Sequence, residues 1–335
     1  MNERSLNIQS YGLDDAYSDI QILNYQKQVL CCEEYRYKFP HEPDQKRTKV
    51  HVGESIVAYC KSAFNNFIDS DMEFEEALNS GYHHPITGSF NIGNLSRDED
   101  ILVCIDSIVP FYDKVWCITK SAGTLKDKFI NHGKSAFERV MHLYMPPYSN
   151  AFSPMVGIIG TVPKFKDIGS GRGGDHGGNL DLPCVKVGAK IILPSYNRFS
   201  DIWFGDIHAK QGEGELAGVA LECSGEVKFR IFPVRLHKKA KAPIIISDSD
   251  DENGYSIYFV GCRDTFSNAV KAAMNNAIRY EKIWESYGFV NSYEKVGLSG
   301  NLIVGQAIGK TISVAIKTQI SGIDRIIKSV SGGVF

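Results

Sequence analysis

Two polar, glycine-rich blocks separated by an apolar run hold most of the side chains in this sequence that could do chemistry. The first block runs from Gly173 to Asp181, the second from Gly205 to Glu215, and the apolar run between them is Val185 to Leu193. The blocks carry carboxylates, imidazoles and amides, namely Asp175, His176, Asn179, Asp181, Asp206, His208, Gln211, Glu213 and Glu215. Because glycine lets the backbone approach a ligand closely, this combination indicates the floor of an active site.

The spacing of the polar side chains within the blocks favours a metal site. Residues i and i+2 of an extended chain lie on the same face. This spacing relates three pairs: Asn179 and Asp181, Asp206 and His208, and Glu213 and Glu215. Two adjacent strands would therefore bring carboxylate oxygens and imidazole nitrogens to one point, and a zinc-like divalent ion takes such ligands in a catalytic site. The alternative is that these are polar turn residues that satisfy backbone groups.

Composition and charge exclude several other classes of protein. The 335-residue chain is 43% hydrophobic and 23% charged, which is ordinary for a globular protein with a large core. Its formal net charge of −2 gives no electrostatic case for binding nucleic acid or a membrane surface. The sequence lacks a membrane-spanning apolar run, an apolar signal segment and any CxxC pair among its eight cysteines. We therefore expect a cytoplasmic protein with reduced thiols.

Short apolar and β-branched runs predict a β-rich α+β fold. Strands are expected at Ile101–Ile105, Met155–Thr161, Val185–Leu193 and Glu226–Phe232, and across Asn301–Ile320, which Gly305 and Gly309 break into separate strands. One long helix is expected at Asp264–Gly288, with Asp264 or Thr265 as its N-cap.

Three segments resemble the acetamidase/formamidase family. Gly205 to Glu215 looks like the family's GDxHAxQGDGE signature. His176 to Asp181, followed by a strand at Gly188 to Pro194, resembles its preceding GGNxD block. Upstream, His84 to Gly88 resembles its HPxTGP segment, and the similarity extends over residues 48–320.

The resemblance implies a fold with β-sandwich and barrel-like parts and a smaller α/β portion. It divides the chain into an N-terminal extension (1–45), a catalytic domain (46–320) and a C-terminal tail (321–335). Within the catalytic domain we expect β-rich subregions near 46–165 and 166–235 and the α/β portion near 236–320. It also implies a homodimer that hydrolyses a small linear amide to a carboxylate and ammonia.

The same resemblance assigns roles to individual residues. A divalent metal, zinc or alternatively calcium, would be held by Asp181, Asp206 and His208. The expected catalytic groups are Glu215 as general base, Glu213 where the family commonly has Asp, and the amides of Asn179 and Gln211 as oxyanion donors. Contacts to the substrate are expected from His84, Thr87, His176 and Gly178.

Departures from the family pattern keep other functions open. Ser62 stands where the resemblance implies an acid, and the loop from Gly93 to Asp100 carries an apparent insertion. These differences allow a larger amide as the substrate, or a diverged protein that binds without catalysis. A third alternative is a cysteine nucleophile, Cys184 or Cys60, activated by His176.

Overall fold

The computed structural model describes residues 29–30, 35–42, 47–64, 76, 79–119, 136–139, 152–196, 198–248, 255–280, 293–294, 296–318 and 326–330. Its strands are β1 (Val29–Leu30), β2 (Lys38–Phe39), β3 (Thr48–Lys49), β4 (Ile56–Cys60), β5 (Ile86–Asn91), β6 (Glu99–Thr119), β7 (Ala136–Arg139), β8 (Met155–Thr161), β9 (Ile168–Gly169), β10 (Gly173–Gly174), β11 (Gly177–Asn179), β12 (Lys190–Leu193), β13 (Ile202–Lys210), β14 (Leu221–Leu236), β15 (Ile244–Asp248), β16 (Tyr255–Arg263), β17 (Asn301–Gln306), β18 (Ile312–Thr318) and β19 (Ile327–Val330). The helical elements are the 3₁₀ turn η3 (Glu213–Glu215) and the helix α4 (Phe266–Ile278).

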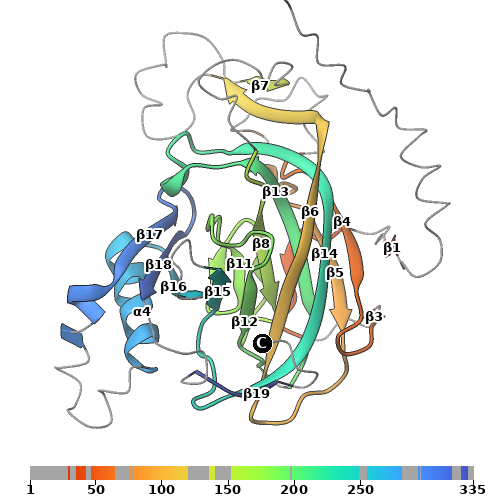
Figure 1. Cartoon of the computed structure of the whole chain (residues 1–335). Coiled ribbons are helices and arrows are strands. Elements are labelled where there is room, and N and C mark those ends of the chain that lie inside the picture. The colour runs from red at the N-terminus through yellow and green to blue at the C-terminus, as the bar shows by residue number, and fades with distance from the viewer. Residues whose placement is uncertain are drawn as a thin grey trace, which may run out of the picture.

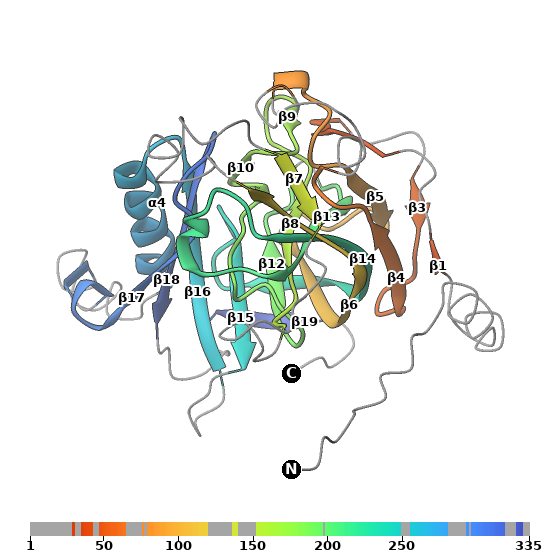
Figure 2. The ribbon, with the colours of Figure 1, turned by 90° about the horizontal axis from the view of Figure 1, so that it is seen from above.

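One curled, mostly antiparallel sheet forms the body of the molecule (Figure 1). The long strands β6 and β14 pair antiparallel from Glu222 opposite Trp116 to Arg235 opposite Glu99. Figure 2 shows β16, β18 and α4 on one side of the molecule and β4 and β5 on the other, with β8, β12 and β13 between them. The β-rich α+β class predicted from the sequence is therefore confirmed.

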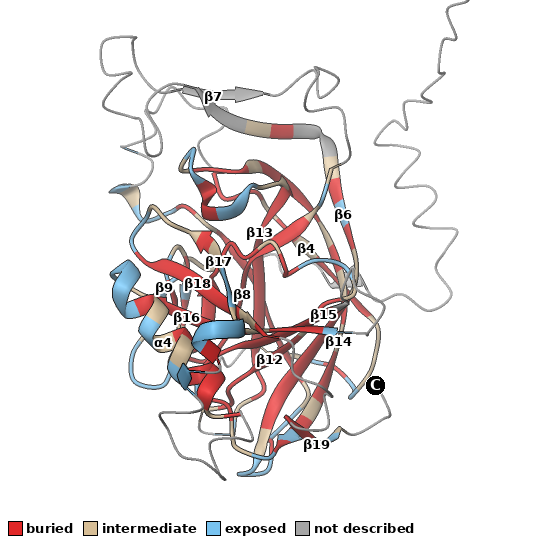
Figure 3. Ribbon diagram, turned by 60° about the vertical axis from the view of Figure 1, so that its left-hand side comes forward, coloured by how far each residue is buried: buried red, intermediate tan, exposed pale blue. Residues whose placement is uncertain are grey.

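The buried centre of the sheet is formed by β8 and β13. Every residue of β8 is buried, and it has the bounds predicted from its apolar run. A strand that is covered on both faces needs such a continuous apolar sequence. β13 pairs antiparallel with β8, β5 and β14, so it is held from several directions. Nearly all of β13 is buried (Figure 3). The strand that carries two of the predicted ligands is thus among the most constrained parts of the fold.

Two expectations about elements need correction. The strand predicted at Val185–Leu193 begins only at Lys190, because the chain first makes turns held by Val185 N–H to Leu182 O and Ala189 N–H to Lys186 O. The helix α4 ends at Ile278, and the rest of its predicted span from residue 281 lies outside the described residues.

The segments expected to flank the catalytic domain also contribute strands. β1 pairs with β4 and β19 pairs with β14, so both ends of the described chain join the main sheet. Among the described helices, none is long and apolar enough to cross a membrane.

Helix α4 packs its alanine face against β16. Thr265 caps the helix, as expected for one of the two predicted caps, by accepting a hydrogen bond from Asn268 N–H. Ala269 and Ala273 are fully buried and lie over Gly261 of β16. Small residues on both sides therefore bring the helix backbone directly onto the strand.

Gly261→Ala is expected to destabilise this layer. The added Cβ would lie 2.2 Å from Ala269 O and 2.4 Å from Ala273 N, and backbone atoms cannot move away without displacing the helix. We expect a loss of about 3 kcal/mol in the free energy of unfolding, at the upper end of overpacking effects. Urea titration measures the loss, and Gly169→Ala, whose Cβ would meet nothing within 4 Å, is the matched control. Equal midpoints for the two variants would contradict the expectation.

Candidate metal centre

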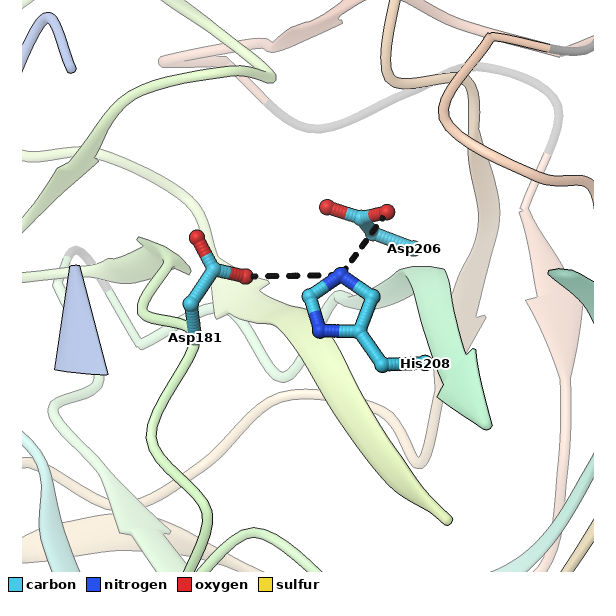
Figure 4. Close-up of side chains that lie close together, drawn as sticks. All are labelled: Asp181, Asp206 and His208. Atoms are coloured by element: carbon cyan, nitrogen blue, oxygen red, sulfur yellow. Dashed lines mark ion pairs between the residues drawn. The ribbon is translucent and has the colours of Figure 1, made fainter. Parts of the chain in front are cut away.

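Three predicted ligands converge in the buried centre of the sheet (Figure 4). His208 Nε2 lies 3.3 Å from Asp206 Oδ1 and 3.8 Å from Asp181 Oδ1. One ligand atom from each of the three residues lies within 4.8 Å of the others. All three side chains are almost completely buried. The geometry is that of a site able to hold one cation.

The backbone that presents these carboxylates is strained. Among the described residues, positive φ angles at non-glycine positions occur at five places, His84, Asp181, Arg198, Asp206 and Glu215. Four of these residues lie at the centre. A left-handed conformation costs a non-glycine residue about 1–2 kcal/mol, so the surrounding sheet must hold these residues in place.

Gln211 fixes the orientation and tautomer of His208. Its Nε2 donates to Asp181 O at 2.6 Å and to Gly305 O at 3.1 Å, which leaves Gln211 Oε1 facing His208 Nδ1 at 2.7 Å. The imidazole therefore carries its proton on Nδ1, and Nε2 is the atom free to bind a metal. Both amide hydrogens of Gln211 are used in this way, so the expected oxyanion role of Gln211 does not fit the structure.

Hydrogen bonds from β17 and β18 hold the backbone around Asp181 and the side chain of Gln211. Ser313 Oγ of β18 donates a hydrogen bond to Leu180 O, next to Asp181. Gly305 O of β17 accepts from Gln211, as described above. Asn179 Nδ2 also donates to Asp181 Oδ2 at 2.8 Å. The carboxylate of Asp181 is thus held by Asn179 of its own segment, whereas Ser313, more than a hundred positions later, holds the backbone next to it.

Glu222 belongs to the centre and was not predicted. It lies opposite His208 in the β13–β14 ladder, and its Oε2 is 3.5 Å from His208 Nε2. Together with Glu215 it forms a second group of potential ligands around the same imidazole. Only the strand register reveals this neighbour, because Glu222 lies beyond the second glycine-rich block.

The two glutamates of the second block point to different places. The sequence interpretation assumed an extended chain with Glu213 and Glu215 on one face, but η3 is a 3₁₀ turn with positive φ at Gly214 and Glu215. Glu215 is buried and accepts from Gln306 Nε2 at 3.2 Å, whereas Glu213 is exposed. The structure therefore brings only Glu215 into the centre.

Burial and mutual repulsion dominate the electrostatics of the centre. Burial raises the pKa of Asp181 and Glu222 well above the usual range, and neighbouring carboxylates add to the effect; burial also raises the pKa of Glu215 to about 7. Burial acts against ionisation of Asp206 as well, but the charges of His208 and His84 lower its pKa below the usual range. Four buried carboxylates this close together cannot all be ionised unless a positive charge or bound protons offset their repulsion.

The donor set fits a divalent metal ion. Asp181 Oδ1, Asp206 Oδ1, His208 Nε2 and Glu222 Oε2 are buried atoms that have no hydrogen-bond partner among the described residues. Buried polar atoms are otherwise nearly always satisfied. Imidazole nitrogen with carboxylate oxygen is a ligand combination that zinc accepts. A cation would satisfy all of these atoms and neutralise the repulsion between the carboxylates.

The four predicted substrate contacts occupy different environments. His84 Nε2 lies 3.6 Å from Asp206 Oδ2, so His84 borders the centre. Thr87 is buried and donates to Tyr59 O at 2.7 Å, which ties β5 to β4. Gly178 of β11 pairs with Ile159 of β8, so it is part of the main sheet. His176 packs edge-on against Phe39, with ring centroids 4.9 Å apart.

His176 is expected to make the protein acid-sensitive. Burial lowers the pKa of His176 to about 3, and neither ring nitrogen has a hydrogen-bond partner among the described residues. The unfolded state binds a proton below pH 6.5 while the folded state does not, so stability falls as the pH drops from about 6.5 to about 3. The slope for one such group is about 1.4 kcal/mol per pH unit.

Urea titrations across this pH range measure the effect of His176. His176→Leu should lower the slope of the unfolding free energy against pH by about 1.4 kcal/mol per pH unit, and His51→Leu, which removes an exposed imidazole, is the matched control. The same slope for His176→Leu and the wild type would rule out this origin of acid sensitivity.

The alternative nucleophiles are unsuited to attack. Cys184 and Cys60 are buried, and burial raises the pKa of Cys184 to about 12. A reactive thiol needs a lowered pKa and partial exposure, so the cysteine-nucleophile hypothesis is not supported for Cys184. Ser62 is buried at the end of β4, where its N–H donates to Ser224 Oγ at 3.0 Å.

The fold is that of solved acetamidases. A predicted acetamidase/formamidase from Thermoanaerobacter tengcongensis superimposes with a TM-score of 0.74 at 20% identity, covering 88% of this chain and 95% of that one. An acetamidase from Bacillus halodurans gives a TM-score of 0.73 at 19% identity, with 87% and 97% of the chains covered. These similarities establish the architecture in which the centre lies.

Sequence comparison finds similar proteins over a shorter span. Residues 168–295 match the model of the Acetamidase/Formamidase family, a region that contains all three predicted ligands. A formamidase from Methylophilus methylotrophus is 33% identical over 58 residues, which are 17% of this chain and 14% of that protein. The resemblance inferred from the motifs is therefore confirmed.

Proposed function

We propose that this protein is an amidohydrolase that cleaves the C–N bond of a small linear amide, similar to formamide or acetamide, to a carboxylate and ammonia. The observation that carries the proposal is the convergence of buried atoms from Asp181, Asp206 and His208 that have no hydrogen-bond partner among the described residues. This centre lies within the segment that matches the family. The names of the similar proteins support an amide as the substrate.

Zinc is the proposed ion, held by Asp181, Asp206 and His208, with Glu222 beside them. When bound, it supplies a Lewis acid that polarises the amide carbonyl and lowers the pKa of water toward about 7. The chain prepares the ligands for this role. Gln211 keeps the proton of His208 on Nδ1, and Asn179 orients Asp181.

Glu215 is the proposed general base. Its buried carboxylate, with a pKa raised to about 7, suits proton transfer near neutral pH. It takes the proton of the attacking water and returns it to the leaving nitrogen. Gln306 Nε2 holds one of its oxygens in place. Asn179 retains one amide hydrogen for the developing oxyanion, a contact worth roughly 3–4 kcal/mol in comparable sites.

Ammonia release from a series of amides, from formamide to larger acyl amides, tests the proposal when metal content is assayed on the same preparation. We expect bound zinc and release from the small amides. His208→Ala should remove both the metal and the activity, because the centre loses its nitrogen ligand. Full activity in a preparation free of metal would contradict the proposed chemistry.

A further inference from the structure

A line of polar side chains connects the metal centre to the protein surface. His84 Nε2 lies 3.6 Å from Asp206 Oδ2 at the inner end. His84 and His83 face each other through their Nδ1 atoms, with ring centroids 4.7 Å apart and planes at 79°. At the outer end, His83 Nε2 lies 3.5 Å from the ammonium nitrogen of Lys310, which is exposed.

The two ends of this line allow one arrangement of protons. A lysine ammonium group only donates, so His83 Nε2 must accept and the proton of His83 lies on Nδ1. His84 Nδ1 then accepts from His83, and the proton of His84 lies on Nε2, facing the carboxylate of Asp206. In the reverse arrangement, His84 would turn a nitrogen lone pair toward the carboxylate of Asp206. His83 would then turn an N–H toward the ammonium group of Lys310.

We propose that Lys310 and His83 are positioning residues that hold His84 as its Nε2–H tautomer. In this tautomer His84 presents an N–H to Asp206 and has no lone pair on Nε2 for a metal. Asp206 Oδ2 is thereby oriented by His84, which leaves Oδ1 directed at His208. The benefit to metal binding rests on the proposed function, whereas the tautomer itself does not depend on it.

The surroundings of Gly171 independently support the contact between His83 and His84. A Cβ at this position would lie 2.9 Å from His83 Cε1 and 3.0 Å from His84 Nδ1. The absence of a side chain at Gly171 lets the two rings meet at their Nδ1 atoms. The control position Gly169, two residues earlier, faces open space.

The first test reads the tautomer directly in the metal-free protein by long-range ¹H–¹⁵N correlation spectra of labelled histidine. The wild type, Lys310→Arg and Gly169→Ala should all show His84 as the Nε2–H form. Lys310→Met, which loses the donor, and Gly171→Ala, which separates the rings, should show a mixture with the Nδ1–H form. An Nδ1–H form in the wild type, or a pure Nε2–H form in Lys310→Met, would overturn the proposal.

The second test measures the zinc dissociation constant by chelator competition. Lys310 acts on Asp206 only through His83 and His84. Because loss of a group that orients a metal ligand weakens metal binding by about 10–100-fold, we expect a loss at the low end of that range, about tenfold, for Lys310→Met and recovery in Lys310→Arg. Unchanged zinc affinity in Lys310→Met would refute the positioning role. Failure to hydrolyse amides would refute the proposed function and leave the tautomer result as it stands.

Discussion

Glu215→Gln is expected to reduce turnover at least about 100-fold while the protein keeps its zinc, because general base catalysis contributes about 10²–10⁴-fold. The substitution preserves the size of the side chain and an acceptor for Gln306 Nε2, but it removes the group that takes the proton of water. Steady-state ammonia release and metal analysis on the same sample separate the two effects. We expect a lower kcat with little change in zinc content.

Glu213→Gln is the matched control for this prediction. It makes the same chemical change two residues earlier, at a side chain that the structure places on the surface. Normal turnover in Glu213→Gln and lost turnover in Glu215→Gln would assign the base to Glu215. Loss of zinc in Glu215→Gln would instead make Glu215 a ligand, and a defect in Glu213→Gln would restore the role predicted from the sequence.

Gly157→Ala is expected to weaken zinc binding at the centre, because the new methyl group would meet the predicted ligands. A Cβ on Gly157 of β8 would lie 2.5 Å from Asp181 Oδ1, 2.9 Å from Asp206 O and 3.1 Å from His208 Cε1. The methyl group would therefore occupy the space of a ligand oxygen and force Asp181 to turn away. We expect zinc affinity to fall at least about 100-fold, equivalent to about 3 kcal/mol, with a matching loss of activity at limiting zinc.

Isothermal titration with zinc measures this loss, and Gly169→Ala again provides a control with the same chemical change in open space. Asp181→Asn tests the ligand itself without adding volume, so the interpretation survives if Gly157→Ala folds poorly. Wild-type zinc affinity in both Gly157→Ala and Asp181→Asn would show that Asp181 does not bind the ion.

The sequence carries enough information to predict much of the centre. The apolar run of β8 defines a buried strand with its observed bounds. The i, i+2 spacing and the family motifs single out Asp181, Asp206 and His208, which the structure brings together. These features are local, so they are readable from short stretches of sequence.

The features that were missed depend on long-range pairing or on local backbone geometry. Glu222 reaches the centre through the register of β14 against β13, and no short motif encodes that register. The extended conformation assumed for Glu213 and Glu215 fails because positive φ at Gly214 winds the segment into a turn. Lys310 approaches His83 across 227 positions of sequence, a contact that spacing alone cannot indicate.

The hydrogen bonds from β17 and β18 also determine when the centre can be completed during synthesis of the chain. Gly305 O holds Gln211, and Ser313 Oγ holds the carbonyl next to Asp181. A growing chain can have both bonds only after residue 313 has left the ribosome. Until then Asp181 and His208 lack part of their support, although both have already been synthesised. We therefore expect stable zinc uptake to follow synthesis of β18, with the metal entering a centre whose supporting strands are already in place.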